Sequence, residues 1–252
     1  MSARSRFSGA LRGLLRRTGR EVVPYTVPSL PALQRRQLMS DHGVTLVLDV
    51  GGNIGQTGGE LRDEGYTGRI VSFEPLSSAF AELSRQANLD GNWECRQLAL
   101  GESDGDAQIN VSGFSASSSL LPMIHRHVEM IPGSKYVSTE TIKLVRLDSI
   151  FADVARPSDR IMLKIDAQGY ELPVLRGAVA SLNRIALIQL EVSLVPLYEG
   201  QAKYHEVMQY LDQQSFDLVG IVPGFYDARI KHFLQADGLF VRRVSKPPSV
   251  SE

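Results

Sequence analysis

The stretch from Leu46 to Gly55 reads LVLDVGGNIG, an apolar run carrying one acid that leads into a glycine-rich turn. The run has the length of a buried strand, and the residues after the turn follow a helical pattern. Glycines in such a turn let the backbone approach a ligand closely. Ligands of open α/β sheets bind beyond the carboxyl ends of the strands. The stretch therefore predicts a nucleotide-like site from residue 51 onward.

Short apolar runs alternate with helical patterns along the rest of the chain, which indicates βαβ units and a parallel sheet. Residues 101–147 break this alternation and predict a β-containing insertion over the sheet. We expect one α/β domain at 41–246, preceded by a basic arm and linker at 1–40 and followed by a tail at 247–252. The predicted strands are residues 44–50, 69–74, 93–98, 160–166, 185–192, 217–222 and 238–244, with 107–111 and 141–147 in the insertion, and the predicted helices are 54–64, 77–89, 171–182 and 202–214.

The composition is that of an ordinary globular protein, with 252 residues, 43% of them hydrophobic and 22% charged. A chain of this length can bury a sizeable core. The single cysteine, Cys95, excludes a disulfide framework and a thiolate zinc cluster, and favours a reducing compartment. No apolar run approaches the roughly 20 residues that span a bilayer. A cytoplasmic location is therefore expected.

The charge is distributed unevenly, because the first 40 residues carry eight arginines and one acid, whereas the other 212 carry 19 basic and 27 acidic residues. Residues 4–20 predict a basic amphipathic helix at the start of a helical arm. Three interpretations stay open: a solvated arm or lid, an organelle transit peptide, or peripheral contact of residues 1–20 with an anionic membrane. The arm lacks the interleaved aromatic residues of a nucleic-acid surface, so no nucleic-acid partner is expected.

The acid in the opening stretch decides which nucleotide the glycine loop suits. Asp49 lies two residues before Gly51, where its charge would repel a pyrophosphate. The glycines Gly51, Gly52 and Gly55 also do not fit the Gly-x-Gly-x-x-Gly spacing of dinucleotide sites. S-adenosylmethionine has no phosphate and carries an ammonium and a sulfonium that a carboxylate attracts. We therefore expect Asp49 and the loop through Asn53 to bind S-adenosylmethionine.

A second acid, Glu74, lies 25 residues after Asp49 at the end of the next predicted strand and is followed by Pro75. A carboxylate there can accept both ribose hydroxyls of a bound nucleoside. NAD sites place an acid at a similar distance, so an NAD-dependent oxidoreductase or epimerase remains an alternative. A cofactor-binding subunit without catalysis is a third hypothesis.

Five ordered motifs, within about residues 40–243, resemble the FkbM family of S-adenosylmethionine-dependent O-methyltransferases. The resemblance implies a class I, Rossmann-like fold, in which a seven-stranded, mostly parallel sheet ends in an antiparallel strand. It also implies methyl transfer to a hydroxyl, commonly on a sugar, polyketide or other secondary metabolite, and adenine contact near Ala99. The motifs are DVGGNIGQ (49–56), FEP (73–75), LKIDAQGYE (163–171), QLEVS (189–193) and PLYEG (196–200).

Methyl transfer to a hydroxyl requires a group that positions the acceptor and takes its proton. Asp166, at the end of the fourth predicted strand, is the first choice for this role, with Lys164, Glu171 and Glu191 behind it. Each has a structural alternative. Lys164 and Asp166 could simply pair, Glu171 suits the first turn of a helix, and Glu191 could only hydrogen-bond a neighbouring loop.

The sequence defines a metal site and the methyl acceptor less closely than it defines the cofactor site. Asp166 and Glu191 are hard oxygen ligands, which leaves a divalent metal open, but two carboxylates without a third ligand do not support one. The expected acceptor is a small molecule or a glycan- or lipid-linked hydroxyl. DNA amino-methylation is not expected, since the strand before residue 167 lacks the Asn/Asp-Pro-Pro-aromatic turn of those enzymes. The sequence does not indicate an oligomeric state.

Overall fold

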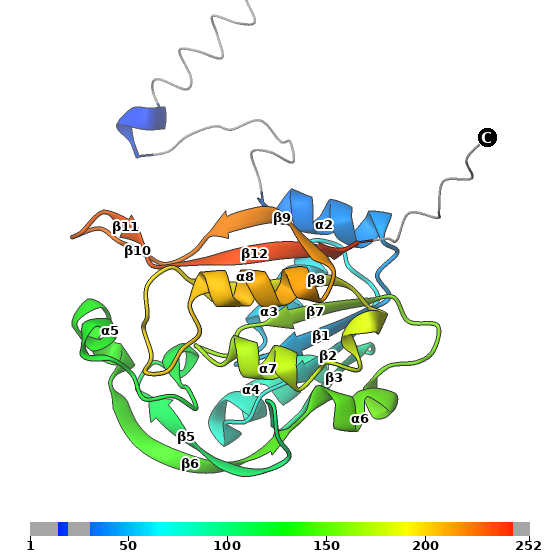
Figure 1. Ribbon diagram of the computed structural model, residues 1–252, viewed down its shortest axis with the longest axis horizontal. Helices are drawn as coiled ribbons and strands as arrows, with labels where there is room; N and C mark the ends of the chain where they lie inside the picture. The colour runs from blue at the N-terminus through cyan, green and yellow to red at the C-terminus, as the bar shows by residue number, and fades with distance from the viewer. Residues whose placement is uncertain (1–14, 20–30, 244–252) are drawn as a thin grey trace, which may run out of the picture.

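A computed structural model describes residues 15–19 and 31–243 (Figure 1). Its main sheet has seven strands in the order β3-β2-β1-β7-β8-β12-β9. Neighbouring strands are parallel except at β12, which runs antiparallel to both β8 and β9. This topology confirms the expected Rossmann-like sheet with an antiparallel last strand. The strands are β1 (Leu46–Val50), β2 (Arg69–Phe73), β3 (Trp93–Arg96), β7 (Ile161–Ile165), β8 (Ile185–Ser193), β9 (Phe216–Pro223) and β12 (Gln235–Arg242).

The helices connect these strands and cover both faces of the sheet. Those predicted after β1, β2 and β8 form near their expected bounds, whereas α2, α5 and α6 were not predicted. The helix expected at 171–182 is shorter than predicted, because it ends at Arg176 where Gly177 packs against the backbone of Gly101. The helices are α2 (Pro31–Asp41), α3 (Gln56–Asp63), α4 (Ser77–Ala87), α5 (His125–Met130), α6 (Leu147–Val154), α7 (Glu171–Arg176) and α8 (Tyr204–Gln213), with 3₁₀ turns η2 (Ser115–Ser117), η3 (Pro132–Ser134) and η4 (Leu182–Arg184).

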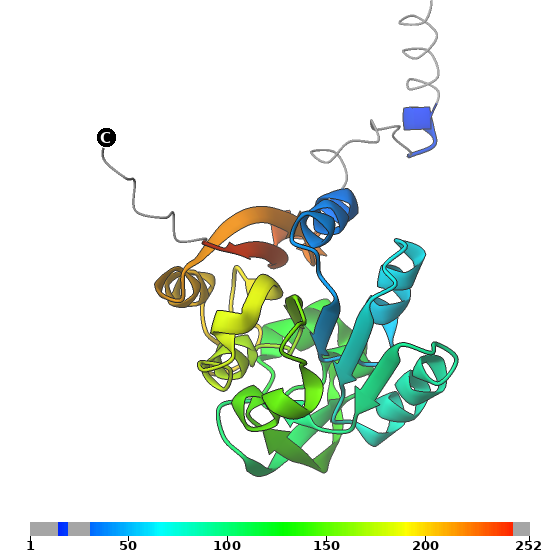
Figure 2. The ribbon, with the colours of Figure 1, turned by 90° about the vertical axis from the view of Figure 1, so that its right-hand side faces the viewer.

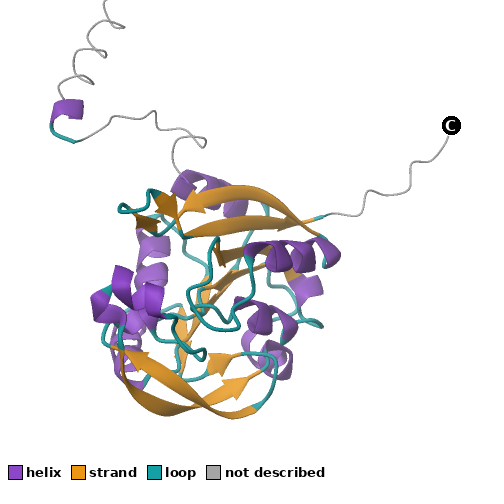
Figure 3. Ribbon diagram, turned by 60° about the vertical axis from the view of Figure 1, so that its left-hand side comes forward, coloured by secondary structure: helices purple, strands orange, loops and turns teal. Residues whose placement is uncertain are grey.

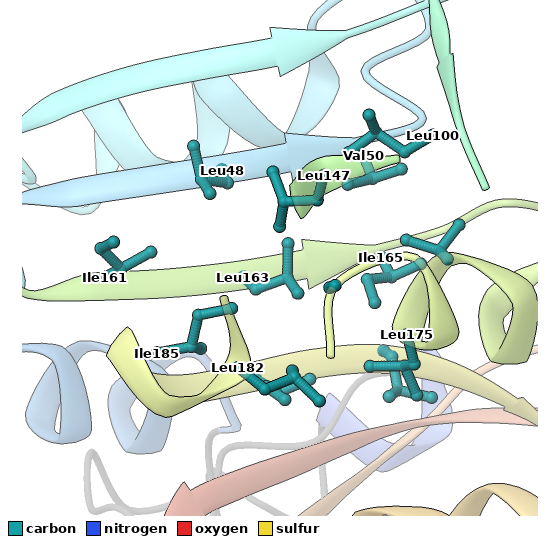
Figure 4. Close-up of a cluster of buried hydrophobic side chains, with 14 of the residues drawn as sticks. Leu48, Val50, Leu100, Leu147, Ile161, Leu163, Ile165, Leu175, Leu182 and Ile185 are labelled. Atoms are coloured by element: carbon teal, nitrogen blue, oxygen red, sulfur yellow. The ribbon is translucent and has the colours of Figure 1, made fainter. Parts of the chain in front are cut away.

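One face of the sheet is apolar and is covered by α6, α7 and α8. Leu48 of β1 and Leu163 of β7 are fully buried there, beside Leu147 of α6 and Leu175 of α7 (Figure 4). Burial of each such leucine stabilises the fold by about 2 kcal/mol. This core holds the central strands in place, and with them the loops at their carboxyl ends.

The opposite face is covered by α2 and α3. Buried Met39 of α2 and Leu61 of α3 pack on Val47 near the amino end of β1. Gln34 of α2 also donates a side-chain hydrogen bond to the carbonyl of Val219, which docks α2 beside β9 (Figure 2). Residues 31–41 thus form a packed helix where the sequence predicted a linker.

The insertion forms a separate three-stranded sheet in the order β4-β6-β5, on the far side of the molecule from β9 and β12 (Figures 1 and 3). Its strands are β4 (Ala99–Leu100), β5 (Gly105–Ser112) and β6 (Tyr136–Val145). Both predicted insertion strands form: β5 extends beyond its predicted bounds at both ends, whereas β6 begins and ends earlier than predicted. Ile109 and Ile142 pack with Leu76 in a small core between this sheet and α4. A hairpin of β10 (Tyr226–Asp227) and β11 (His232–Phe233) precedes β12.

Most of the predicted arm and the tail at 247–252 lie outside the described residues. Within residues 15–19 and 31–243, no helix has both the length and the apolar character needed to cross a membrane.

Candidate active site

A cavity of about 310 Å³ opens at the carboxyl ends of β1, β2 and β7, between the main sheet and the insertion. Predicted residues from the glycine loop, the second strand and the fourth strand meet in its wall. The insertion contributes serines, and α2 and β12 contribute one charged side chain each. The residues used below are Arg35, Gly51, Asn53, Glu60, Glu74, Pro75, Ala99, Ser115, Ser118, Ser119, Lys164, Asp166, Gln168, Tyr170, Gln189 and Asp237.

The glycine loop bends sharply into α3. Gly51 has φ 77° and Gly55 has φ 101°, values in the left-handed region that favours glycine. A Cβ on Gly51 would overlap the carbonyl oxygen of Asp166, so the first glycine is required by close packing of two loops as well as by its dihedral angle. The N–H groups of Gly51 and Gly52 both donate to the carbonyl of Phe73. The loop is therefore a fixed backbone surface beside the cavity.

Glu74 is 5% exposed and supports this loop. Its Oε2 accepts from the N–H of Asn53 at 2.8 Å, and its Oε1 accepts from the N–H of Leu76 at 2.8 Å. Burial raises the pKa of Glu74 to about 7, although these two backbone hydrogen bonds oppose the shift. A carboxylate has about four lone-pair sites, so each oxygen retains one for a ligand. The geometry suits the two ribose hydroxyls for which the sequence predicted this residue.

A polar row crosses the α2/α3 face of the sheet just below the cavity. Ser72 donates to Asp49 Oδ2 at 2.8 Å, and Lys164 Nζ lies 3.5 Å from Asp49 Oδ1 and 3.5 Å from Asp166 Oδ2. Burial lowers the pKa of Lys164, but the charges of Asp166, Asp49 and Asp237 outweigh it and raise that pKa overall. The lysine is therefore a fixed cation between carboxylates. Asp49 is fully buried behind it and does not line the cavity.

The same row continues to the last strand. Gln189 of β8 stands in register with Lys164, and its Nε2 donates to Asp237 Oδ2 of β12 at 2.7 Å. Burial raises the pKa of Asp237, with the Gln189 hydrogen bond opposing the shift. The cavity wall thus holds Glu60, Glu74, Asp166 and Asp237 against Arg35 and Lys164. This excess of acids favours a cationic ligand and disfavours a pyrophosphate.

The loop after β7 carries Asp166 at the cavity wall. Asp166 Oδ1 accepts from Gln168 Nε2 at 2.6 Å, and Gln168 Oε1 in turn accepts from the hydroxyl of buried Tyr198 at 2.9 Å. Glu171 accepts from the N–H groups of Ala167 at 3.1 Å and Gly169 at 3.0 Å. Burial raises the pKa of Glu171 to about 7 despite these hydrogen bonds. Glu171 lies behind the loop, where its contacts hold the backbone of residues 167–169.

Glu191 also lies outside the cavity wall. Its Oε2 accepts from Gln235 Nε2 of strand β12, whereas the structural alternative considered for it was a hydrogen bond to a neighbouring loop. Burial and the neighbouring charges of Asp166, Glu171 and Asp237 raise its pKa well above the usual value. No group of three metal-ligating side chains occurs among residues 15–19 and 31–243.

The structure brings together most of the predicted site residues. Gly51, Asn53, Glu74, Pro75, Ala99, Lys164 and Asp166 line the cavity. Asp49, Gly52, Gly55, Glu171 and Glu191 do not line it.

Sequence reasoning missed Arg35, Gln189 and Asp237 in the cavity wall. Gln189 and Asp237 interrupt otherwise apolar strands, which is a signal because unpaired polar groups on buried strands are costly. Arg35 gave no such signal, since it lies beside Arg36 in a stretch expected to be a linker.

The Rossmann-like sheet, the glycine loop without a phosphate site and the acid after β2 define a class I methyltransferase. Residues 49–218 match the methyltransferase FkbM domain, and the chain belongs to this family. The sequence resemblance is therefore confirmed. The protein is a methyltransferase with S-adenosylmethionine as its methyl donor, and the NAD-dependent alternative is not supported.

Solved structures with similar folds are distant in sequence. A putative S-adenosylmethionine-dependent methyltransferase from Listeria monocytogenes has a TM-score of 0.48 and 7% identity, covering 84% of this chain and 96% of the other. An rRNA methylase from Streptococcus thermophilus has a TM-score of 0.46 and 10% identity, covering 85% and 97%. Aeropyrum pernix fibrillarin with natively bound S-adenosyl-L-methionine has a TM-score of 0.45 and 11% identity, covering 82% and 74%. No curated protein matches the sequence significantly.

Proposed function

We propose that this methyltransferase acts on a hydroxyl group of a small molecule, such as a sugar, a glycolipid or a secondary metabolite. The observation that carries the proposal is the placement of Asp166 at the cavity wall, with its side chain 39% exposed. A hydroxyl acceptor has to be aligned with the methyl group and has to lose a proton, and a fixed carboxylate serves both needs.

Asp166 is held by two contacts. Lys164 lies against Oδ2 and Gln168 donates to Oδ1, so the carboxylate cannot swing away from the cavity. Its remaining lone pairs can accept a hydrogen bond from the hydroxyl group of the substrate that is to be methylated. The bound cofactor supplies an electrophilic methyl group on a positively charged sulfur. The chain's own residues orient the acceptor and receive its proton at Asp166.

The polar groups beside Asp166 on the insertion side are mostly uncharged. Ser115, Ser118 and Gln168 contribute hydroxyl and amide groups, which suit a polyhydroxylated acceptor. The two cations of the wall, Arg35 and Lys164, already pair with carboxylates. The wall holds more acidic than basic side chains, which disfavours a phosphate backbone and supports a small acceptor over a nucleic acid.

The test uses purified protein, S-adenosylmethionine with a labelled methyl group, and cell extract separated into lipid, small polar metabolite, protein and RNA fractions. The proposal expects label in the lipid or metabolite fraction, in a product whose mass rises by one methylene. Label confined to RNA or protein would contradict it.

The matched variants are Asp166→Asn and Asp153→Asn. Asp166→Asn should reduce transfer about 100-fold or more, because general-base catalysis contributes about 10²- to 10⁴-fold. Its affinity for S-adenosylhomocysteine should fall much less. Asp153 is an exposed residue of α6 away from the cavity, so its variant should retain full transfer. Equal transfer by both variants would rule out Asp166 as the base.

Membrane attachment of residues 1–20, which would bring the enzyme to a lipid-linked acceptor, stays part of this proposal. Deletion of residues 1–20 should abolish sedimentation with anionic vesicles, and added salt should weaken the binding of the full chain. Binding that survives the deletion would contradict the attachment.

A further inference from the structure

A second hollow of about 410 Å³ adjoins the cavity, between α2, α3 and the β9–β12 edge of the sheet. Four residues line both hollows and stand where they meet, and we call them the Arg35 compartment. They are Arg35, Glu60, Gln189 and Asp237. The mechanism proposed above uses none of its members.

Arg35 presents unused donors to this space. Its Nε donates to Glu64 Oε2 at 3.2 Å and its Nη2 donates to Glu64 Oε1, while Glu60 lies 3.6 Å from Nη2. Nη1 makes no hydrogen bond with any residue that the structure describes. The side chain is 11% exposed, so its cationic edge is largely shielded from solvent. A guanidinium with free N–H groups in such a place fits a carboxylate.

Gln189 and Asp237 present the opposite polarity. Gln189 is 7% exposed, and its Oε1 is buried without a partner among the described residues, because its Nε2 is donated to Asp237. An unpartnered buried oxygen is costly unless a ligand supplies a donor. Asp237 uses only Oδ2 in its bond with Gln189. Both side chains therefore offer acceptor oxygens, which fit an ammonium.

We propose that the Arg35 compartment binds the amino-acid end of S-adenosylmethionine, with Arg35 on its carboxylate and Asp237 and Gln189 Oε1 on its ammonium. The cationic Arg35 and the anionic Asp237 match the carboxylate and the ammonium of this zwitterionic amino-acid end. Arg35 and Asp237 both lie outside residues 49–218, so the family match does not include either residue. The proposal rests on the use of S-adenosylmethionine and not on the identity of the acceptor.

Two anchors define the direction of the cofactor across the cavity. Glu74 would hold the ribose and the Arg35 compartment would hold the amino acid, and Asp166 lines the same cavity. The charge of Lys164 lowers the pKa of Asp237 and so opposes the rise that burial causes.

The experiment compares two nucleosides by calorimetric titration. S-adenosylhomocysteine carries the amino-acid end, and 5′-methylthioadenosine lacks it but retains adenosine and sulfur. Arg35→Gln and Asp237→Asn should each lower the affinity for S-adenosylhomocysteine about tenfold or more, because a hydrogen bond to a charged group contributes about 1.5–3 kcal/mol. In both variants the affinity for methylthioadenosine should stay within about twofold of that of the wild type.

Two control variants separate recognition from structural support. Arg36→Gln removes the exposed neighbour on α2 and should change neither affinity. Glu64→Gln weakens the ion pair between Arg35 and Glu64, as Arg35→Gln does, but it leaves the guanidinium in place. The affinity for S-adenosylhomocysteine should therefore be unchanged or higher.

The proposal is overturned if Glu64→Gln weakens the binding of S-adenosylhomocysteine as much as Arg35→Gln does. It is overturned as well if Arg35→Gln weakens the binding of both nucleosides equally. It is also overturned if the wild type binds both nucleosides equally. None of these results would affect the proposed hydroxyl acceptor, because no acceptor enters the titration.

Discussion

The glycine-loop end of the cavity comes from one continuous stretch, residues 50–76, whereas the Arg35 compartment takes its four residues from α2, α3, β8 and β12. At the first end the backbone makes the shape, through Gly51 and through N–H groups that Glu74 fixes. At the second end side chains do so, through the charges of Arg35 and Asp237 and the amide of Gln189. The first end should therefore be sensitive to added atoms, and the second to changes of charge and pairing.

The largest effect is expected at Lys164, which joins the two ends. Lys164→Met leaves Asp49 and Asp166 without their cation, and breaking a buried pair costs about 3–5 kcal/mol. Chemical denaturation should show this loss in the free energy of unfolding. Adding Asp49→Asn should recover part of it, because one uncompensated charge is then removed.

The control is Lys143→Met, since Lys143 is exposed on β6 and its variant should change stability by less than about 0.5 kcal/mol. Equal costs for the two lysines would mean that the polar row contributes nothing to stability.

Gly51→Ala tests the backbone-shaped end. The added Cβ meets the carbonyl of Asp166 in a left-handed residue, so we expect a loss of about 3 kcal/mol together with loss of S-adenosylhomocysteine binding. Gly65→Ala is the matched control, because Gly65 has φ 87° but open space around its Cβ position. It should lose only about 1 kcal/mol and keep its affinity. Similar losses at both positions would show that the close contact with Asp166 is unimportant.

The affinity for S-adenosylhomocysteine should rise with pH through about 7, where Glu74 ionises. We expect the ionised carboxylate to accept the ribose hydroxyls, so binding should favour release of a proton and strengthen by up to about tenfold between pH 6 and pH 8. Titrations in buffers of different ionisation enthalpy measure the proton released.

Glu74→Gln should remove this pH dependence, whereas Glu171→Gln should retain it although burial also raises the pKa of Glu171 to about 7. A pH profile that is unchanged by Glu74→Gln would assign the effect to another group.

The smallest effect is expected at Trp93→Phe. The Trp93 indole N–H donates to Ser72 Oγ at 3.0 Å, and Ser72 in turn donates to Asp49. Loss of this outer hydrogen bond should cost about 1 kcal/mol in denaturation and leave cofactor affinity within about twofold. Ser72→Ala should cost more, since it removes a donor from a buried carboxylate. The reverse order would contradict the polar row as described.

Local sequence patterns were sufficient to predict much of the fold. Apolar runs predicted all seven strands of the sheet, and the signal is strongest in β1 and β7, which are parallel strands buried along their whole length. Residues 31–41 were missed as a helix, because Pro28, Pro31 and a weakly amphipathic sequence indicate a linker until Met39 is seen to pack on the sheet.

The candidate site divides in the same way. Glu74, which the sequence predicted to accept the ribose hydroxyls, lines the cavity, since its distance from the glycine loop is set by one βαβ unit. Glu191 was predicted near the reaction centre, but it is paired with Gln235 on a strand that arrives 44 residues later. Register between distant strands depends on packing across the whole sheet, which no local spacing specifies.

By itself, the sequence determined the glycine turn, the acid after the second strand and the family, because each is written in residues a short distance apart along the chain. Only the tertiary structure decided that Arg35 and Asp237, separated by most of the chain, face one cavity, and that Lys164 is shared between two carboxylates. The reason is physical: a turn is specified by local backbone conformation, whereas a charge cluster exists only after packing has excluded water from around it.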